Sequence, residues 1–205
     1  MRVHPTAIIE EGVLIGPGTS VWDNVHIRHA TQIGRDCVIG EKTHIAYDVI
    51  IGDRVKINAF VYICTAVSIE DGVMVAAGTI FTNDRFPRAT TSDLRHARTS
   101  APDEHTWPTL VRRGATIGAH CTIGCDLTIG RFAMVGMGSV VTRSVPDFHL
   151  VVGHPARSIG CVCRCGAVVH RFVEGGATEI ETACPECGLR YVVRDRIVTE
   201  LTPPS

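Results

Sequence analysis

Cysteine spacing near the C-terminus is the first feature of this sequence that could do chemistry. Five of the nine cysteines fall in two short motifs, Cys161-Val-Cys163-Arg-Cys165-Gly and Cys184-Pro-Glu-Cys187-Gly. A Cys-x-x-Cys-Gly turn presents two thiolates to one zinc ion. We expect Cys163, Cys165, Cys184 and Cys187 to hold a structural zinc, because four thiolates leave no open position for a substrate. Cys161 is then the spare, although the spacing also permits it in place of Cys163. A metal-free hairpin with reduced thiols is the alternative.

A six-residue period runs through most of the chain and must position any such chemistry. The third position of each six is bulky and apolar from Val3 through Phe81, and again from Val111 through Val141. A period of six excludes an amphipathic helix, whose period is about 3.6 residues. It fits short strands whose side chains alternate between inward and outward positions.

Three such strands, joined by turns, make a triangular coil of 18 residues. The fourth position of a six is often glycine, and we expect this glycine to relieve the turn, as at Gly16, Gly34, Gly40 and Gly52. Neighbouring coils stack at an interstrand spacing of about 4.8 Å, and each buries its aliphatic face only against the next. The pattern therefore predicts an all-β parallel β-helix rather than a sandwich with coincidental spacing.

The repeat is interrupted by residues 85–108, a polar segment of 24 residues that contains three prolines. A structureless insert of this length in a compact domain is usually functional or disordered. Since intact repeats flank it, we expect a loop that projects from one corner of the coil and reaches a neighbouring subunit. A solvated excursion without function is the alternative.

Residues 18 apart stack on one outer face of the coil. One column is expected to run through His26, His44, Tyr62 and Ile80, then beyond the interruption through Thr116 and Met134. Apolar and aromatic side chains are costly to expose in quantity. We interpret this column as a subunit interface or ligand groove, with scattered surface hydrophobes as the alternative.

Ten histidines raise the question of a second metal site. Carbonic anhydrases of the gamma class bind zinc on a β-helix with two histidines five residues apart and a third about two coils earlier. His149 and His154 have the five-residue spacing, but the position two coils before His149 is Arg113. Three imidazoles are needed for such a site, so the sequence gives little support for a zinc site of the gamma carbonic anhydrase type.

Composition excludes several classes of function. The net charge is −1, so no basic excess indicates nucleic acid or an anionic membrane as a partner. No stretch of about 18 apolar residues predicts a membrane span, and the first residues lack the apolar region of a signal peptide. Nine cysteines without a secretion signal favour a reducing compartment, which predicts a cytoplasmic protein.

The sixes resemble those of left-handed β-helix acyltransferases of the hexapeptide family. Three segments narrow the resemblance to bacterial nucleotide-sugar 3-N-acetyltransferases, including those that act on UDP-2-acetamido-3-amino-2,3-dideoxyglucuronate: GTIFTNDRFPRA, PTLVRRGATIGAHCTIG and VVTRSVPDFHLVVGHPAR. These segments and the repeat cover nearly all of residues 1–160. The resemblance implies a left-handed coil, a homotrimer, and acetyl-CoA bound in grooves between subunits.

The resemblance also implies roles for particular residues. Asn83 and Asp84 match the entry to the long loop, where Asn83 would hold the sugar near its reacting amine and Asp84 would orient it; both are our catalytic candidates. Arg85 would meet a phosphate or carboxylate of the substrate, as a guanidinium fork does. The expected acetyl-CoA contacts are Gly118, Gly136 and Arg157.

The sequence thus predicts two parts, a β-helix acyltransferase domain over residues 1–158 and a zinc-ribbon-like segment over 159–205. We expect acetyl transfer from acetyl-CoA to the amino group, at C3, of a nucleotide-linked amino sugar. No residue is an obvious general base; His44 and His120 are candidates, and the thiolate leaving group is the other proton acceptor. An O-acyltransferase and a non-catalytic binding protein are the alternatives.

Overall fold

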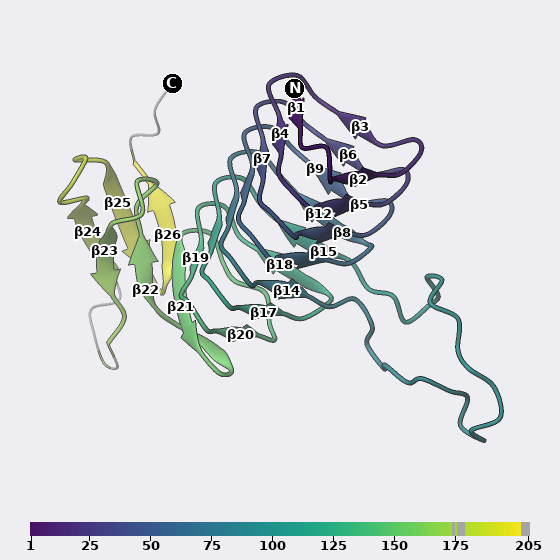
Figure 1. Ribbon diagram of the computed structural model, residues 1–205. Coiled ribbons are helices and arrows are strands. Elements are labelled where there is room, and N and C mark those ends of the chain that lie inside the picture. Colours follow the sequence, from purple (N-terminus) through teal and green to yellow (C-terminus); the bar gives the residue numbers. More distant parts are fainter. Residues whose placement is uncertain (174, 176–178, 202–205) are drawn as a thin grey trace.

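The computed structural model of the protein describes residues 1–173, 175 and 179–201. In this part of the chain every regular element is a strand, and most strands are two residues long. Three sheets of parallel strands form the sides of a stacked coil, which confirms the predicted β-helix (Figure 1). These same residues contain no helix that is long and apolar enough to cross a membrane.

The strands fall into four sheets. Sheet A contains β1 (Arg2–Val3), β4 (Ser20–Val21), β7 (Val38–Ile39), β10 (Lys56–Ile57), β13 (Met74–Val75), β16 (Thr116–Ile117), β19 (Met134–Val135), β21 (His149–Gly153), β22 (Ala156–Val162) and β23 (Val168–Arg171). Sheet B contains β2 (Ile8–Ile9), β5 (His26–Ile27), β8 (His44–Ile45), β11 (Tyr62–Ile63), β14 (Ile80–Phe81), β17 (Thr122–Ile123) and β20 (Val140–Val141). Sheet C contains β3 (Leu14–Ile15), β6 (Gln32–Ile33), β9 (Ile50–Ile51), β12 (Val67–Ile69), β15 (Thr109–Val111) and β18 (Leu127–Ile129). The fourth sheet is antiparallel and contains β24 (Glu179–Ala183), β25 (Arg190–Arg194) and β26 (Ile197–Glu200).

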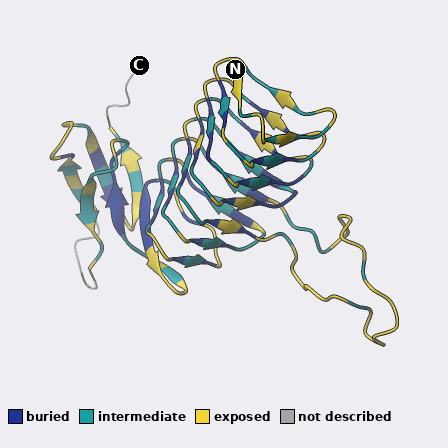
Figure 2. Ribbon diagram, viewed as in Figure 1, coloured by how far each residue is buried: buried dark blue, intermediate teal, exposed yellow. Residues whose placement is uncertain are grey.

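The core is a column of aliphatic side chains inside the coils. Third-position residues such as Ile27, Ile39 and Ile45 are fully buried, so the inner faces of the coils are dry (Figure 2). Backbone hydrogen bonds join each coil to the next, as where the Gly40 N–H donates to the Ile57 carbonyl at 2.7 Å. Because burying one such side chain contributes about 1.5–3 kcal/mol, stability accumulates coil by coil.

The turns differ from what the sequence led us to expect. Left-handed backbone occurs at the sixth position of most sixes, often on a non-glycine residue such as Ala30 (φ 58°) or Phe60 (φ 58°). The fourth-position glycines lie outside the left-handed region and are needed for another reason. A Cβ atom on Gly40 would lie 2.6 Å from the carbonyl carbon of Asn58 in the next coil. Glycine at this position therefore permits close coil contact rather than the turn itself.

The long interruption leaves the stacking register intact. Residues 85–108 leave the corner between sheets B and C and project away from the coil (Figure 1). Across this insert Ile80 pairs with Thr122 and Val67 pairs with Thr109, 42 positions apart instead of 18. The difference equals the length of the insert, so the coils on either side stack as if the loop were absent.

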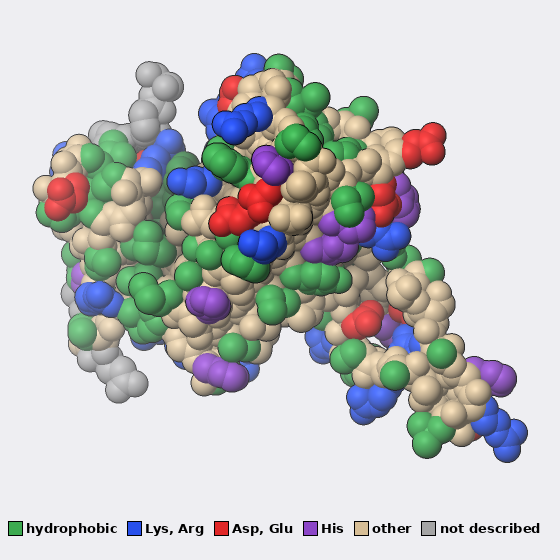
Figure 3. Space-filling model, viewed as in Figure 1, with side chains coloured by type: hydrophobic (Ala, Val, Ile, Leu, Met, Phe, Trp, Pro, Cys, Tyr) green, Lys and Arg blue, Asp and Glu red, His purple; other side chains and the backbone are tan. Residues whose placement is uncertain are grey.

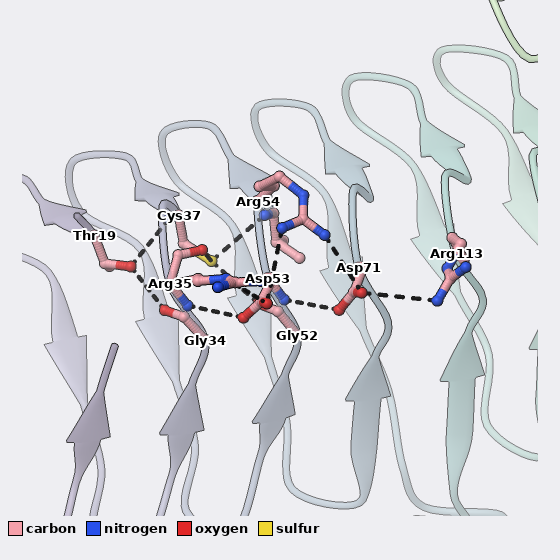
Figure 4. Close-up of polar contacts among 10 residues, drawn as sticks. Thr19, Gly34, Arg35, Cys37, Gly52, Asp53, Arg54, Asp71 and Arg113 are labelled. Carbon is pink, nitrogen blue, oxygen red and sulfur yellow. Dashed lines mark hydrogen bonds and ion pairs between the residues drawn. The ribbon is translucent and has the colours of Figure 1, made fainter. Parts of the chain in front are cut away.

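Charged side chains form a ladder along the corner between sheets C and A (Figure 4). Arg35 Nε lies 2.9 Å from Asp53 Oδ2, while Arg54 and Arg113 lie 3.6 Å and 3.9 Å from the carboxylate of Asp71. The backbone N–H of Arg35 also donates to Asp53, and this bond and the guanidinium lower the pKa of that carboxyl. Exposed ion pairs contribute about 0–1 kcal/mol each, so the ladder supplements the backbone bonds.

The coil continues beyond Val141, the last third position of the six-residue period. Val145 forms a parallel bridge with Ile129, and Leu150 of β21 pairs with Met134 of β19. The spacing has departed from six, which hides these residues from a search for the period, but their apolar side chains still stack. Sheet A then runs on through the antiparallel strands β22 and β23.

The antiparallel sheet β24–β26 packs on this last part of the stack. Tyr191 of β25 is fully buried, and its ring centroid lies 5.6 Å from that of Phe148, which stacks on Phe132 at 5.4 Å. The final four residues of the predicted 159–205 segment, and residues 174 and 176–178, lie outside the described residues.

We expect the substitution Gly40→Ala to destabilise the coil and Gly124→Ala to do so far less. The two glycines share the fourth position, but the nearest atom to a Cβ on Gly124 is the Val141 carbonyl oxygen at 3.1 Å, against backbone atoms at 2.6 and 2.7 Å for Gly40. Overpacking of this kind costs about 1–3 kcal/mol. Chemical denaturation of both variants measures the difference, and equal losses would contradict the close-contact explanation.

Candidate functional site

A cavity of about 230 Å³ lies between the outer face of sheet B and the base of the projecting loop. His44, Tyr62 and Cys64 come from the coil, and Asn83 and Asp84 come from the point where the chain leaves it. The remaining wall is formed by the loop, chiefly Arg88, Arg98, Asp103 and Thr106. The structure thus brings the two residues expected to be catalytic into one cavity with a histidine.

Stacked rings build the coil side of this cavity. The His44 ring lies parallel to the Tyr62 ring with centroids 5.3 Å apart, and the His26 ring meets His44 edge-on at 5.0 Å. A second stack, His29 on Tyr47, runs beside it at 5.2 Å. Histidine side chains gather on the face of the coil above the projecting loop (Figure 3). The 18-residue register causes this stacking, because it places each ring one coil below the next.

The predicted column is correct up to Ile80 and wrong beyond it. Ile80 pairs with Thr122 and Thr122 with Val140, whereas Thr116 stacks on Met74 in sheet A. The chain leaves sheet B before the loop and re-enters the coil on sheet C, so Thr116 belongs to the following side. Met134 pairs with Thr116 and therefore lies on sheet A as well.

Asn83 and Asp84 are held by the neck of the loop. The backbone N–H of Trp107 donates to the backbone carbonyl of Asn83 at 2.8 Å, and Asp84 forms an antiparallel bridge with Thr106. Asn83 is half-buried and Asp84 is exposed. Because the backbone of both residues is fixed across the neck, their side chains have defined positions at the cavity.

Arg85 lies apart from the cavity lining. The Arg85 guanidinium lies over the Trp107 ring, 4.5 Å from the centroid. The backbone N–H of Arg85 donates to the carbonyl of His105. The cationic residues at the cavity are instead Arg28, Arg88 and Arg98, which our reading of the sequence did not single out. The hexapeptide pattern gives no signal for two of them because they belong to the loop.

The three cavity arginines differ in how their charge is compensated. Arg28 lies 3.3 Å from Glu10, and Arg98 lies 2.8 Å from Asp103. Arg88 donates to the Pro87 carbonyl at 2.9 Å, and no carboxylate pairs with it within the described residues. Arg88 is thus the cation in the lining with charge left for an anionic ligand.

Electrostatics favour a neutral imidazole at His44. Burial lowers its pKa, and the neighbouring charges of His26 and Arg28 lower it further. Its ring makes stacking contacts but no hydrogen bond with any described residue. A neutral imidazole with a free nitrogen is able to accept a proton from a bound amine or hydroxyl.

The other titratable groups near His44 suit supporting roles. Burial raises the pKa of the Cys64 thiol to about 12, which keeps it protonated and excludes it as a nucleophile at neutral pH. The His29 backbone N–H, 3.0 Å from Glu10, is the main reason that the pKa of Glu10 falls to about 2. Glu10 therefore stays charged and holds the imidazole of His26 at 2.8 Å.

Two other histidines have structural surroundings. His149 is buried and bridges Ser158 Oγ and the Arg196 carbonyl, each at 2.8 Å, which engages both of its ring nitrogens. This arrangement is incompatible with the metal role considered for His149 and His154. His120 is exposed and lies over Gly78, where a Cβ atom would come within 2.6 Å of its ring.

The residues expected to contact acetyl-CoA lie away from Asn83. Gly118 and Gly136 follow sheet A strands, at the corner between sheets A and B, whereas Asn83 follows a sheet B strand at the next corner. A Cβ atom on Gly118 would lie 2.5 Å from the Met137 nitrogen, so close coil contact alone accounts for this glycine. Arg157 is exposed on β22, and its guanidinium donates to the Ala156 carbonyl.

The four cysteines expected to bind metal lie together. The sulfur atoms of Cys163, Cys165, Cys184 and Cys187 all lie within 4.8 Å of one another. Cys161 is buried, and it lies outside this cluster.

Comparison with known proteins agrees with the coil architecture. Residues 6–47 and 48–83 match the family model of the bacterial transferase hexapeptide with six repeats. The solved structure of a mutant of AntD, an N-acyltransferase from Bacillus cereus in complex with dTDP and coenzyme A, is similar in fold at 20% identity with a TM-score of 0.55. That similarity covers 80% of this chain and 81% of the AntD chain.

Two curated relatives are acetyltransferases. The dTDP-3-amino-3,6-dideoxy-alpha-D-galactopyranose 3-N-acetyltransferase of Aneurinibacillus thermoaerophilus is 45% identical over 93 residues, which is 45% of each chain. Serine acetyltransferase 2 of Arabidopsis thaliana is 28% identical over 157 residues, which is 77% of this chain and 31% of the relative. The chain thus spans less than half the length of either relative. Residues 6–83 of this chain thus match the hexapeptide repeats of that family model, and the coils that these repeats build form a parallel β-helix like the one in AntD.

Proposed function

We propose that this protein transfers the acetyl group of acetyl-CoA to an amino group, at C3, of a nucleotide-linked sugar. The 45% identity to an enzyme named for that reaction on a dTDP-linked 3-amino sugar carries the proposal. The cavity at the loop neck supports it, since an amide, a carboxylate and a neutral imidazole line it together. Nucleophilic attack by an amine on a thioester needs this combination of orientation and proton acceptance.

Each side chain of the cavity has a proposed role. Asn83 holds the sugar through its amide, and Asp84 orients the reacting amine by accepting its hydrogen bond. His44 accepts the proton that the nitrogen loses as the new amide bond forms and the CoA thiolate leaves. Arg88 meets the phosphates of the nucleotide; we propose this role for it in addition to that expected for Arg85, because Arg85 lies outside the cavity lining.

Positioning is proposed to supply most of the rate. Well-oriented reactants gain about 7–11 kcal/mol of barrier reduction, more than the 10²–10⁴-fold, or about 3–5 kcal/mol, that a general base provides. Gly118, Gly136 and Arg157 are proposed to contact acetyl-CoA from the corner between sheets A and B. That corner and the loop corner bound the same face, sheet B, so both substrates would meet on it.

We further propose a homotrimer in a reducing compartment such as the cytoplasm. Two observations support this assembly: exposed Tyr62 and Ile80 continue the column on sheet B, and the loop extends far from its own coil (Figure 1). A neighbouring subunit would cover the column and receive the loop. None of the nine cysteines, all of which the structure describes, forms a disulfide, which suits a reducing compartment.

Acetyl-CoA consumption with a panel of UDP- and dTDP-linked 3-amino and 4-amino sugars tests the reaction. The molar mass of the protein in solution is first measured by light scattering, and a trimer mass of three times 22.1 kDa is expected. Thiol release that depends on one 3-amino sugar is the predicted result, and Asp84→Asn and Asn83→Ala should each lower kcat/KM by about 10²-fold or more.

Asp36→Asn is the matched control for these variants. Asp36 is also exposed, but it lies at the corner between sheets C and A in an early coil, and its left-handed backbone (φ 57°) suits asparagine equally. The acetylation activity of the Asp36→Asn variant should match that of the parent. Release with hydroxyl acceptors such as serine, and with no amine, would contradict the proposal and favour O-acylation, in line with the serine acetyltransferase similarity.

The pH profile tests the role of His44. Because its pKa lies below the ordinary value of 6.5, the imidazole stays neutral at pH 7, and kcat/KM should fall only as the pH drops below that value. In His44→Gln the rate should fall about 10²–10⁴-fold and this acidic limb should disappear. The protonation of the substrate amine affects both proteins equally, so the difference between their profiles isolates His44. An unchanged profile would show that the thiolate accepts the proton.

A further inference from the structure

The cysteine cluster beyond the β-helix joins two sheets that share no strand. Cys163 and Cys165 lie in the turn between β22 and β23, which continue sheet A, and Cys184 and Cys187 lie in the turn between β24 and β25. We propose that these four thiolates bind one zinc ion, and that this ion fastens the β24–β26 sheet to the end of the β-helix. The proposal is independent of the acetyl-transfer function.

The sulfur positions fit a tetrahedral ion. Zinc–sulfur bonds of about 2.3 Å place the four sulfur atoms of a tetrahedron about 3.8 Å apart. Here the Cys163–Cys187 sulfur distance is 3.4 Å, the Cys165–Cys184 distance is 3.5 Å, and every pair lies within 4.8 Å. A disulfide would bring two sulfur atoms to about 2.05 Å, so the cluster is arranged around a common centre and not as two bonded pairs.

The two cysteine turns are built in the same way. In each, a glycine shortly after the cysteine donates its N–H back to the cysteine carbonyl: Gly166 to Cys163 at 2.9 Å and Gly188 to Cys184 at 3.0 Å. Both glycines have left-handed backbone, with φ of 93° and 75°. Each turn supplies two of the four thiols, and the short sulfur distances from one turn to the other bring all four together.

The surroundings suit a structural ion rather than a catalytic one. Cys163 and Cys184 are buried and Cys165 and Cys187 are exposed, so the ion would sit at the boundary of the aromatic cluster. The Tyr191 hydroxyl donates to Cys163 Sγ at 3.0 Å, an outer hydrogen bond of the kind that orients metal ligands. Four protein ligands leave no place for a substrate, and soft thiolates in tetrahedral geometry select zinc or iron.

The fastening role follows from the small number of other contacts between the two sheets. Apart from the packing of Tyr191 on Phe148, the other polar links among the described residues are the His149 contact with the Arg196 carbonyl, the Arg164–Glu200 ion pair at 2.6 Å, the Arg164 backbone N–H bond to the Tyr191 hydroxyl and the Thr182 bond to the Val169 carbonyl. The hydrogen bonds of the coils do not depend on them. Loss of the ion should therefore loosen residues 179–201 and leave the β-helix folded.

Metal analysis of the full chain, purified under reducing conditions, tests the site. We expect about one zinc per chain. The variants Cys165→Ser and Cys187→Ser remove exposed ligands without opening the core, and both should lose zinc to a chelator at least about tenfold more readily than the parent. Cys161→Ala is the matched control, because it removes a thiol two residues from Cys163 but outside the cluster, and it should keep its zinc.

Hydrogen exchange followed by mass spectrometry tests the fastening. Chelation of the parent, or either serine variant, should speed exchange in β24–β26 and leave the coil strands unchanged. A metal-free parent with four reduced thiols, iron in place of zinc, two disulfides, or equal zinc loss in Cys161→Ala would each overturn the site. Unchanged exchange in β24–β26 after complete zinc removal would overturn the fastening role.

Discussion

The 18-residue register of backbone hydrogen bonds between coils is the constraint on which the rest of this structure depends. Strands of two residues cannot bury a core alone, so third-position isoleucines such as Ile45 and Ile57 are dry only because neighbouring coils lie directly on them. The same closeness forces glycine at positions such as Gly40, and the turns between strands take a left-handed residue at most sixth positions. That conformation is unfavourable for residues such as Phe60, and it persists because each turn is bonded to the turns above and below.

The register also explains where the candidate site lies. A loop inserted at a corner leaves the stacking of the coils unchanged, since Ile80 still pairs with Thr122 and Val67 still pairs with Thr109. The loop is then free to carry the side chains that a regular coil cannot present, and its neck fixes Asn83 and Asp84. The coil contributes what stacking provides, a row of rings ending at His44 and Tyr62. Rigid coils and an irregular insert together make the cavity.

Much of the fold could be predicted from the sequence because one period dictates it. The third positions, the interruption and the four clustered cysteines all follow from local spacing. The side of the coil on which the chain re-enters after the loop does not follow from spacing. For that reason the sequence-based prediction placed Thr116 in the wrong column. The partial coil at Val145 could not be predicted from the period, because its spacing departs from six residues. Arg88 and Arg98 could not be foreseen, since the path of a loop without a repeat is set by contacts such as Arg98 with Asp103 and Tyr47 with the Ser100 carbonyl. Likewise, the role of fourth-position glycine emerges only from the distance between coils.

The coil is a self-sufficient scaffold, and we propose that the insert completes an acetyl-transfer site on it. The most direct test replaces residues 85–105 with Asn-Gly, which joins Asp84 to Thr106 across their existing antiparallel bridge through a two-residue turn. Denaturation and amino-sugar acetylation are then measured together on this variant and the parent. We predict a cooperative unfolding transition within about 1 kcal/mol of the parent and acetylation lowered by about 10²-fold or more. Loss of the folded coil, or acetylation at the parental rate, would contradict this account.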